Sequence, residues 1–223
     1  MSNSIATDAI KKTKAQINGN IARINTDTGS KWAIASAAFI FKTPQPCVTL
    51  VKRKGKTRYS GKWALIAGAT SCKKEWRHPS KAVRREAREE LILIKNGKKI
   101  NLLCSSKLLT NNIVKIIDNK TGDIFKDKGE LFAFENEVLF MQIYLVNIFT
   151  KNIVLEDGEL HKGKLLNRLV ALVPINNLQG RVMPHKLFQC GKEIGKREID
   201  LSNYQTPTLD WFRKRSSYYT QFL

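Results

Sequence analysis

Apolar side chains recur every three or four residues in the segment that follows His78 and Pro79. Four residues keep this spacing: Val83, Ala87, Leu91 and Ile94. Such a period places them on one buried face of an α-helix. Proline is favoured in the first turn of a helix, and asparagine followed by glycine is a common stop. The pattern therefore predicts a helix that begins near Pro79 and runs on toward residues 96–97.

Other apolar runs have the length and composition of strands, and turn residues such as Gly, Pro, Asn and Asp separate them. The predicted strands lie within residues 32–41, 47–52, 101–117, 137–149 and 168–173. A closing helix is predicted over residues 208–215, with Thr206 and Pro207 at its start. The sequence has no internal repeat and no low-complexity tract.

The first 30 residues are polar and differ from the rest of the chain. Their isoleucines give a thin, imperfect helical stripe: Ile5, Ile10, Ile17, Ile21 and Ile24. Basic residues surround this stripe. We therefore expect two parts, a basic amino-terminal arm over residues 1–30 and one folded domain over residues 31–223.

The charge of the chain changes this picture of an ordinary globular protein. Lys and Arg total 39 against 19 Asp and Glu, which gives a formal net charge of +20. A fold does not need such an excess, so a polyanionic partner is expected, with RNA or DNA ahead of an anionic membrane. The alternative is a host whose proteins are generally basic. Six residues form the predicted nucleic-acid contact: Lys52, Arg53, Lys54, Lys56, Arg58 and Lys62.

The cysteines and the hydropathy of the chain bear on its location. Cys47, Cys72, Cys104 and Cys190 are widely scattered, which argues against a zinc site or a disulfide framework and favours a reducing compartment. No apolar stretch approaches the roughly 20 residues of a membrane span. We expect a cytoplasmic protein that does not bind membranes, while a mitochondrial location and the oligomeric state stay open.

Three carboxylates gather at the end of the predicted helix. Glu86 and Glu90 are four residues apart and share one helix face, with Glu89 beside them. Such a density of oxygen ligands suits Mg²⁺ or Mn²⁺, which bind through a few carboxylates and substrate phosphates. The alternative is a solvated helix with ordinary surface pairs such as Arg85 with Glu89.

The segment around these carboxylates resembles the Nudix box. Residues 85–90 match its Arg-Glu-aliphatic-x-Glu-Glu core, Gly68 matches its first glycine, and Trp63 matches a tryptophan often found upstream. The resemblance implies an α/β/α sandwich around a mixed sheet and a Mg²⁺- or Mn²⁺-dependent hydrolase of diphosphate bonds. It also implies that Glu86, Glu89 and Glu90 hold the metal, and that Glu89 and Arg85 serve catalysis. A further glutamate from a later loop often assists, and Glu159 (or Glu156) lies in the matching stretch.

The chain departs from the family between Gly68 and Arg85, where it has three extra residues. The loop glutamate is best matched by Glu75, which is out of register. Ile92 stands where the family has a helix-ending glycine. Four residues of the altered loop are expected, together with Arg53, to bind substrate through cationic and aromatic contacts: Lys73, Lys74, Trp76 and Arg77. Alternatively, Trp76 packs against the start of the helix.

Two functions agree with these features. The first is a hydrolase that cleaves a nucleoside diphosphate linked to another moiety, including RNA-linked or capped 5′ ends, which the basic charge favours. The second is a Nudix-like scaffold without catalysis, used for RNA binding or nucleotide sensing in a nucleoprotein particle. The complete set of carboxylates favours the enzyme, and the altered loop favours the scaffold.

Overall fold

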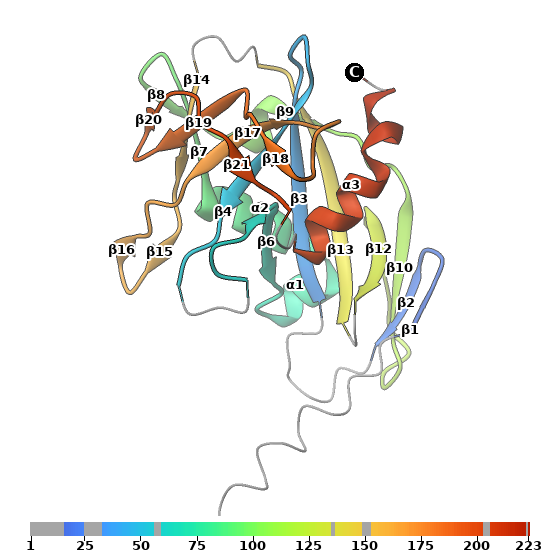
Figure 1. Cartoon of the computed structure of the whole chain (residues 1–223). Helices are drawn as coiled ribbons and strands as arrows, with labels where there is room; N and C mark the ends of the chain where they lie inside the picture. The colour runs from blue at the N-terminus through green and yellow to red at the C-terminus, as the bar shows by residue number, and fades with distance from the viewer. Residues whose placement is uncertain are drawn as a thin grey trace, which may run out of the picture.

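The computed structural model describes residues 16–24, 33–55, 59–134, 137–148, 153–202, 206–221 and 223. A large mixed sheet forms the middle of the molecule (Figure 1). Its strands run in the order β12 (Glu130–Phe134), β13 (Glu137–Val146), β3 (Ala33–Phe41), β4 (Cys47–Lys52), β17 (Val170–Pro174), β19 (Lys186–Gln189) and β20 (Lys192–Glu193). Three short strands extend it: β5 (Trp63–Ala64) on β4, β6 (Ile66–Ala69) on β3, and β9 (Ser106–Leu108) on β13.

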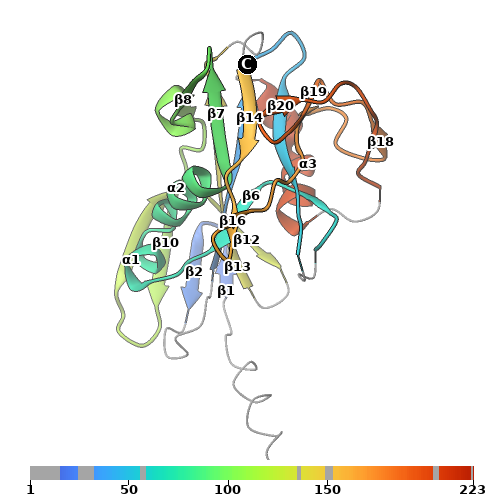
Figure 2. The ribbon, with the colours of Figure 1, turned by 90° about the vertical axis from the view of Figure 1, so that its left-hand side faces the viewer.

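Alternation along the central strands sends side chains to both faces of this sheet. In β3, Ala37 and Phe39 face one core, while Ala38 and Ile40 face the other. Helix α2 (Pro79–Glu90) covers the first face and α3 (Pro207–Thr220) covers the second, as Figure 2 shows from the side. The predicted α/β/α sandwich is therefore confirmed. Because both faces are covered, the central strands are apolar nearly throughout.

Smaller sheets surround this sandwich. One has the order β14 (Ile153–Asp157), β7 (Leu91–Lys95) and β8 (Lys98–Ile100). Two pairs are formed by β15 (Leu160–His161) with β16 (Lys164–Leu165), and by β18 (Arg181–Val182) with β21 (Ile199–Asp200). A short helix α1 (Lys73–Arg77) precedes α2, and a 3₁₀ turn spans Leu102–Ser105.

Part of the predicted amino-terminal arm belongs to a further sheet. Its order is β1 (Gln16–Asn18), β2 (Ile21–Ile24), β10 (Ile113–Asp118) and β11 (Ile124–Lys128). The helical stripe predicted for the arm is wrong for residues 16–24, because β2 pairs in parallel with β10 and buries Ala22 and Ile24. Residues 1–15 and 25–30 of the arm lie outside the described residues.

The start of α2 follows the sequence prediction, and its end does not. Pro79 is its first residue, and the Asp127 carboxylate accepts a hydrogen bond from the Ser80 N–H at 2.9 Å, where an anion is favourable. The helix ends at Glu90, and Leu91 is already extended, so the prediction that it runs on toward residues 96–97 is wrong. The residues after Glu90 instead form strand β7, which pairs with β14 on one side and β8 on the other. Asn96 and Gly97 form the turn between β7 and β8.

Two findings concern the expected location. No helix in the described ranges is both long and apolar enough to cross a membrane. All four cysteines are free, with Cys47 buried and the other three exposed.

Candidate active site

Strand β6 and helix α2 form the two walls of the candidate site. β6 pairs with the edge of β3 through Gly68 opposite Ala35, and α2 packs against both strands. Val83 and Ala87 of α2 are buried in this contact. The same packing turns Glu86 toward β6 and leaves it only 9% exposed. Glu86, which the sequence placed on one helix face with Glu90, is thus held against the sheet.

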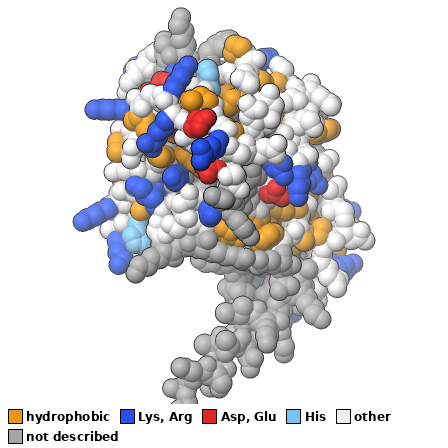
Figure 3. All heavy atoms as spheres, viewed as in Figure 1, with side chains coloured by type: hydrophobic (Ala, Val, Ile, Leu, Met, Phe, Trp, Pro, Cys, Tyr) orange, Lys and Arg blue, Asp and Glu red, His pale blue; other side chains and the backbone are white. Residues whose placement is uncertain are grey.

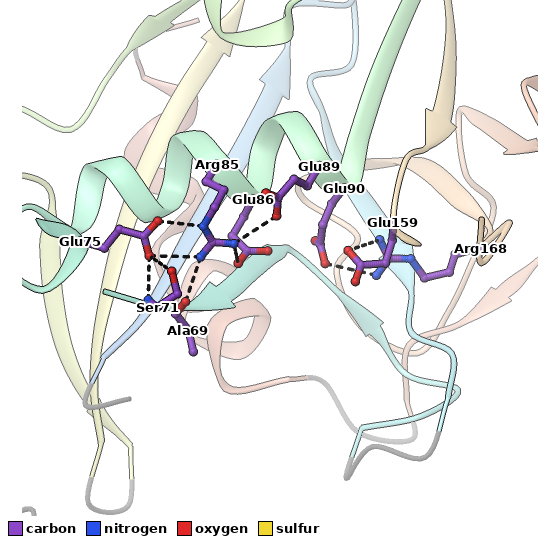
Figure 4. Close-up of polar contacts among 9 residues, drawn as sticks. All are labelled: Ala69, Ser71, Glu75, Arg85, Glu86, Glu89, Glu90, Glu159 and Arg168. Atoms are coloured by element: carbon purple, nitrogen blue, oxygen red, sulfur yellow. Dashed lines mark hydrogen bonds and ion pairs between the residues drawn. The ribbon is translucent and has the colours of Figure 1, made fainter. Parts of the chain in front are cut away.

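Arg85 joins three carboxylates at the start of this site (Figure 4). Its guanidinium lies 2.8 Å from Glu75, 2.6 Å from Glu86 and 3.1 Å from Glu89. It also donates a hydrogen bond of 3.0 Å to the carbonyl of Ala69 in β6. A planar guanidinium holds several acceptors in fixed directions, so Arg85 orients carboxylates instead of facing solvent.

The loop glutamate reaches Arg85 in spite of the altered spacing. Helix α1 takes up part of the extra length and carries Glu75, which is buried. Ser71 donates to the Glu75 carboxylate through its backbone N–H at 2.7 Å and its hydroxyl at 2.8 Å. Burial alone would raise the pKa of Glu75, but the hydrogen bonds from Arg85 and Ser71 outweigh it and lower this pKa to about 2. Glu75 is therefore a permanently ionised partner of Arg85.

Gly68 provides the space that the Glu86 carboxylate occupies. A Cβ atom built on Gly68 would lie 1.7 Å from Oε1 of Glu86. Burial raises the pKa of Glu86, while the charge and hydrogen bond of Arg85 act in the opposite direction. A buried carboxylate held at such a cost is typical of functional sites.

Gly68→Ala is expected to move Glu86 without unfolding the protein, because the clashing atoms are the far end of a flexible side chain. If Glu86 helps to hold a cation, its displacement should lower metal affinity or activity by about 10- to 100-fold. Calorimetric titration with Mn²⁺ measures the change in metal affinity, and a thermal melt in EDTA shows whether the protein stays folded. An unchanged Mn²⁺ affinity would mean that the position of Glu86 does not matter for metal binding.

Glu90 is held by a buried arginine from the other end of the site. Arg168 lies 3.3 Å from Glu90, and its guanidinium donates to Asp157 at 2.9 and 2.7 Å. The exposed fractions of these side chains are 6% for Arg168, 9% for Glu90 and 1% for Asp157. Burial raises the pKa of Glu90 to about 7, although the charge of Arg168 lowers it.

The raised pKa of Glu90 predicts a dependence of stability on pH in metal-free protein. The unfolded carboxyl ionises near 4.5 and the folded one near 7, so the folded state holds the extra proton between these values. The free energy of unfolding should therefore fall as pH rises through this window, by about 3 kcal/mol relative to Glu90→Gln. Urea unfolding of both proteins in EDTA at a series of pH values measures the difference. If the free energy of unfolding changes with pH in the same way in both proteins, the pKa of Glu90 is not raised.

The loop after β14 brings Glu159 to the same place. The N–H of Gly158 donates to the carbonyl of Glu90 at 3.1 Å, and a Cβ on Gly158 would lie 2.5 Å from the carbonyl of Glu89. Only glycine permits this close approach to the end of α2. Glu159 then lies 3.9 Å from Arg168 and raises the pKa of both Glu86 and Glu90.

The donor set at this site agrees with a hard divalent cation. Four carboxylates, those of Glu86, Glu89, Glu90 and Glu159, lie along one side of α2 and the adjoining loop (Figure 4). Carboxylate oxygens are the ligands that Mg²⁺ and Mn²⁺ prefer. Among the described residues, however, no three His, Cys, Asp or Glu side chains converge closely enough to hold an ion. Arg85 and Arg168 engage Glu86 and Glu90, so a cation would require at least one carboxylate to turn from its arginine.

A hollow of about 350 Å³ opens beside Gly68 and is lined in part by Arg53, Tyr59 and Phe134. The charge of Arg53 also acts to lower the pKa of Glu90, after the larger effects of burial and of Arg168. Of the five residues predicted to bind substrate, Arg53 is the one that the structure brings to this hollow.

The other four predicted substrate contacts belong to α1 and lie elsewhere. Trp76 packs with Phe125 and Leu131 against the hydrophobic cluster beneath β2 and β10. Arg77 lies over the ring of Phe125 and forms an exposed pair with Asp123 at 3.6 Å. Lys73, Trp76 and Arg77 line a separate hollow of about 210 Å³, and Lys74 is exposed. Trp76 is thus a packing residue, but the cluster that it joins lies on strands and not at the start of α2 as the alternative had it; a role in substrate binding stays a prediction.

The predicted nucleic-acid contacts are divided among several places. Lys52 and Lys62 line a hollow of about 570 Å³ together with Arg197. Lys54 donates to the carbonyls of Leu166 and Asn167 at 2.9 and 3.1 Å. Lys56 and Arg58 lie outside the described residues.

Arg168 and Asp157 are the site residues that the sequence prediction missed. Asp157 belongs to the acidic stretch around residues 156–159, and Arg168 directly precedes an apolar strand. An isolated arginine beside a buried strand is a weak sign of an internal ion pair. The pairing itself depends on contacts across 78 positions of sequence between Glu90 and Arg168.

Comparisons with known proteins give only weak likenesses. No protein-family model and no curated protein matches the chain. A Nudix hydrolase from M. smegmatis is similar in structure, with 11% identity, a TM-score of 0.42, and coverage of 86% of this chain and 88% of that chain. A MutT NUDIX hydrolase from Burkholderia pseudomallei has 16% identity and a TM-score of 0.34, over 82% of this chain and 96% of that chain. A MutT/nudix family protein from Enterococcus faecalis has 14% identity and a TM-score of 0.34, over 86% and 63%.

Proposed function

We propose that this chain is a Nudix-type hydrolase that uses Mg²⁺ or Mn²⁺ to cleave a nucleoside diphosphate linked to another moiety. One observation carries the proposal. Two buried carboxylates, Glu86 and Glu90, are held one helical turn apart by two different arginine networks, beside a glycine that makes room for one of them. A surface helix needs neither the burial nor the networks.

Each residue of the site has a role in this proposal. A divalent cation supplies the positive charge that offsets developing charge on phosphoryl oxygens. Glu86 and Glu90, with Glu89, would hold that cation, and Arg85 keeps their carboxylates in place. Glu159 is within reach of the same space and is suited to accept a proton from the attacking water. Arg53 carries a positive charge at the edge of the hollow and would bind a substrate phosphate.

RNA-linked diphosphates, including capped 5′ ends, are the substrate class that we favour within this proposal. The net charge of +20 and the cations lining the hollow near Lys52 support a polyanionic substrate over a small nucleotide sugar.

The second candidate is a module that binds RNA or senses nucleotides within a nucleoprotein particle and does not catalyse. The observation that favours it is the pairing of Glu86 with Arg85 and of Glu90 with Arg168, which occupies the carboxylates that a cation would need.

One experiment separates the two candidates. The full chain is incubated with Mg²⁺ or Mn²⁺ and a panel of dinucleotides, nucleotide sugars, nucleoside triphosphates and capped RNA in ¹⁸O-labelled water. Mass spectrometry of the phosphate-containing products identifies the bond that is cleaved. The hydrolase proposal expects labelled product from at least one substrate with wild type and none with Glu90→Gln. Absence of product from both proteins would favour the binding module, and equal product from both would mean that Glu90 does not serve the reaction.

A further inference from the structure

The face of the molecule that carries α3 has a hollow that none of the predicted site residues occupies. It measures about 720 Å³ and lies between the end of β12, the segment around Leu201 and the amino-terminal half of α3. Its size falls within the range of about 300–1,000 Å³ typical of ligand sites. We name it the α3 groove, and its aromatic and basic lining residues are Phe132, Phe134, Trp211, Arg213, Lys214 and Arg215.

Aromatic rings form the floor of the α3 groove. Phe132 stacks on Trp211 with ring centroids 4.9 Å apart. The guanidinium of Arg215 lies 4.3 Å from the centroid of the Trp211 ring. Phe134 is half-buried at the end of β12 and is part of the lining. Trp211 is buried and already contacted by Phe132 and Arg215, so the stack fixes this side of the groove, and Phe134 adds aromatic surface beside it.

Cations form the rim of the same groove. Arg213 and Lys214 share the carboxylate of Asp210 at 3.1 and 2.9 Å, and Arg215 lies 3.9 Å from Glu130. The side chains of Lys214 and Arg215 nevertheless remain 62% and 47% exposed. Figure 3 shows basic side chains next to hydrophobic ones over the part of the molecule that α3 occupies in Figure 1. Exposed positive charge beside aromatic surface suits a ligand with phosphates and planar rings.

The α3 groove lies next to the candidate active site. It shares Phe134 and Pro207 with the hollow that reaches Gly68, behind which Glu86 lies. In the other direction it shares Leu201 with the hollow that contains Lys52, Lys62 and Arg197. The three hollows are therefore neighbours on the surface, with the α3 groove between the other two.

We propose that the α3 groove binds single-stranded nucleic acid, with bases against Phe134 and phosphates on Lys214 and Arg215. The strand continues past Phe134 toward Gly68, so that its end reaches the candidate active site. Only this last step rests on the proposed function, since binding in the groove needs neither a metal nor hydrolysis.

The test uses fluorescence anisotropy with a labelled oligouridylate of about 12 nucleotides, in EDTA, at several salt concentrations. Lys214→Ala combined with Arg215→Ala should flatten the log-log salt dependence by about 1.4, because each lost phosphate contact removes about 0.7 from the slope. Phe134→Ala should weaken binding at least about tenfold, since it removes a stacking surface. The matched control is Lys98→Ala with Lys99→Ala on β8, which removes the same charge from exposed residues of another sheet.

The proposal is overturned if the α3 double variant binds as wild type does. It is also overturned if the Lys98 and Lys99 control loses as much affinity, because binding would then depend on the total charge and not on the α3 groove. Tighter binding of a polyglutamate peptide than of oligouridylate would also overturn it in favour of an acidic protein partner. Because all of these measurements are made without a metal, a failure of the hydrolase proposal would leave their outcome unchanged.

Discussion

Glu86→Gln and Glu90→Gln are each expected to lower metal-dependent hydrolysis by at least about a hundredfold while the protein remains folded. Removing one anionic ligand weakens the cation site and removes charge stabilisation in the transition state, which together are worth several kcal/mol, on the order of a hundredfold or more in rate. The fold should tolerate both changes. Burial raises the pKa of each carboxyl, so its ionised form already opposes folding near neutral pH.

The measurements are turnover of the substrate found with the panel, Mn²⁺ affinity by calorimetry, and unfolding in urea. Glu193→Gln is the matched control, because Glu193 is an exposed carboxylate on β20 whose pair with Lys186 lies outside the site. Its turnover should equal that of wild type. If either site variant also keeps its full turnover, that residue does not hold the metal.

Arg168→Met is expected to cause the largest loss of stability of any single change in the site, about 3–5 kcal/mol. The substitution keeps much of the side-chain volume but leaves Asp157 and Glu90 buried without their cation. A buried charge that loses its partner costs far more than the pair contributes. Near pH 5 the loss should be smaller, because the pKa of Glu90 is about 7 and this carboxyl is then protonated.

Urea unfolding at pH 7.5 and pH 5 measures both effects, with Arg181→Met as the control. Arg181 is exposed on β18, so its replacement should change the free energy of unfolding by no more than about 0.5 kcal/mol. Arg168→Lys should fall between wild type and Arg168→Met, since it keeps the charge but not the forked donor geometry. Equal losses for Arg168→Met and Arg181→Met would mean that the Arg168 network does not stabilise the fold.

Much of the site was readable from local sequence. The spacing of Glu86 and Glu90 placed both on one side of α2, and Pro79 marked the start of that helix. The apolar runs identified β3, β4 and β13, because strands buried on both faces are continuous in hydrophobicity. These features depend only on periods of two and 3.6 residues, which the sequence carries directly.

The end of α2 and the place of Glu75 were decided by tertiary structure. Residues after Glu90 are compatible with a helix by their local period, but they form β7 between β14 and β8, which buries Leu93. Glu75 meets Arg85 because α1 absorbs the changed spacing, and no count of residues reveals that.

Partners that are distant in sequence account for what the sequence did not determine. Residues 16–24 form strands because β10, which is far along the chain, offers them a parallel edge. Arg168 balances Glu90 and Asp157 only once β17 and the loop after β14 are folded against α2. The sequence by itself thus determined which carboxylates share a helix face. The tertiary structure decided which cations hold them, because an ion pair depends on distance in space and leaves no period in the chain.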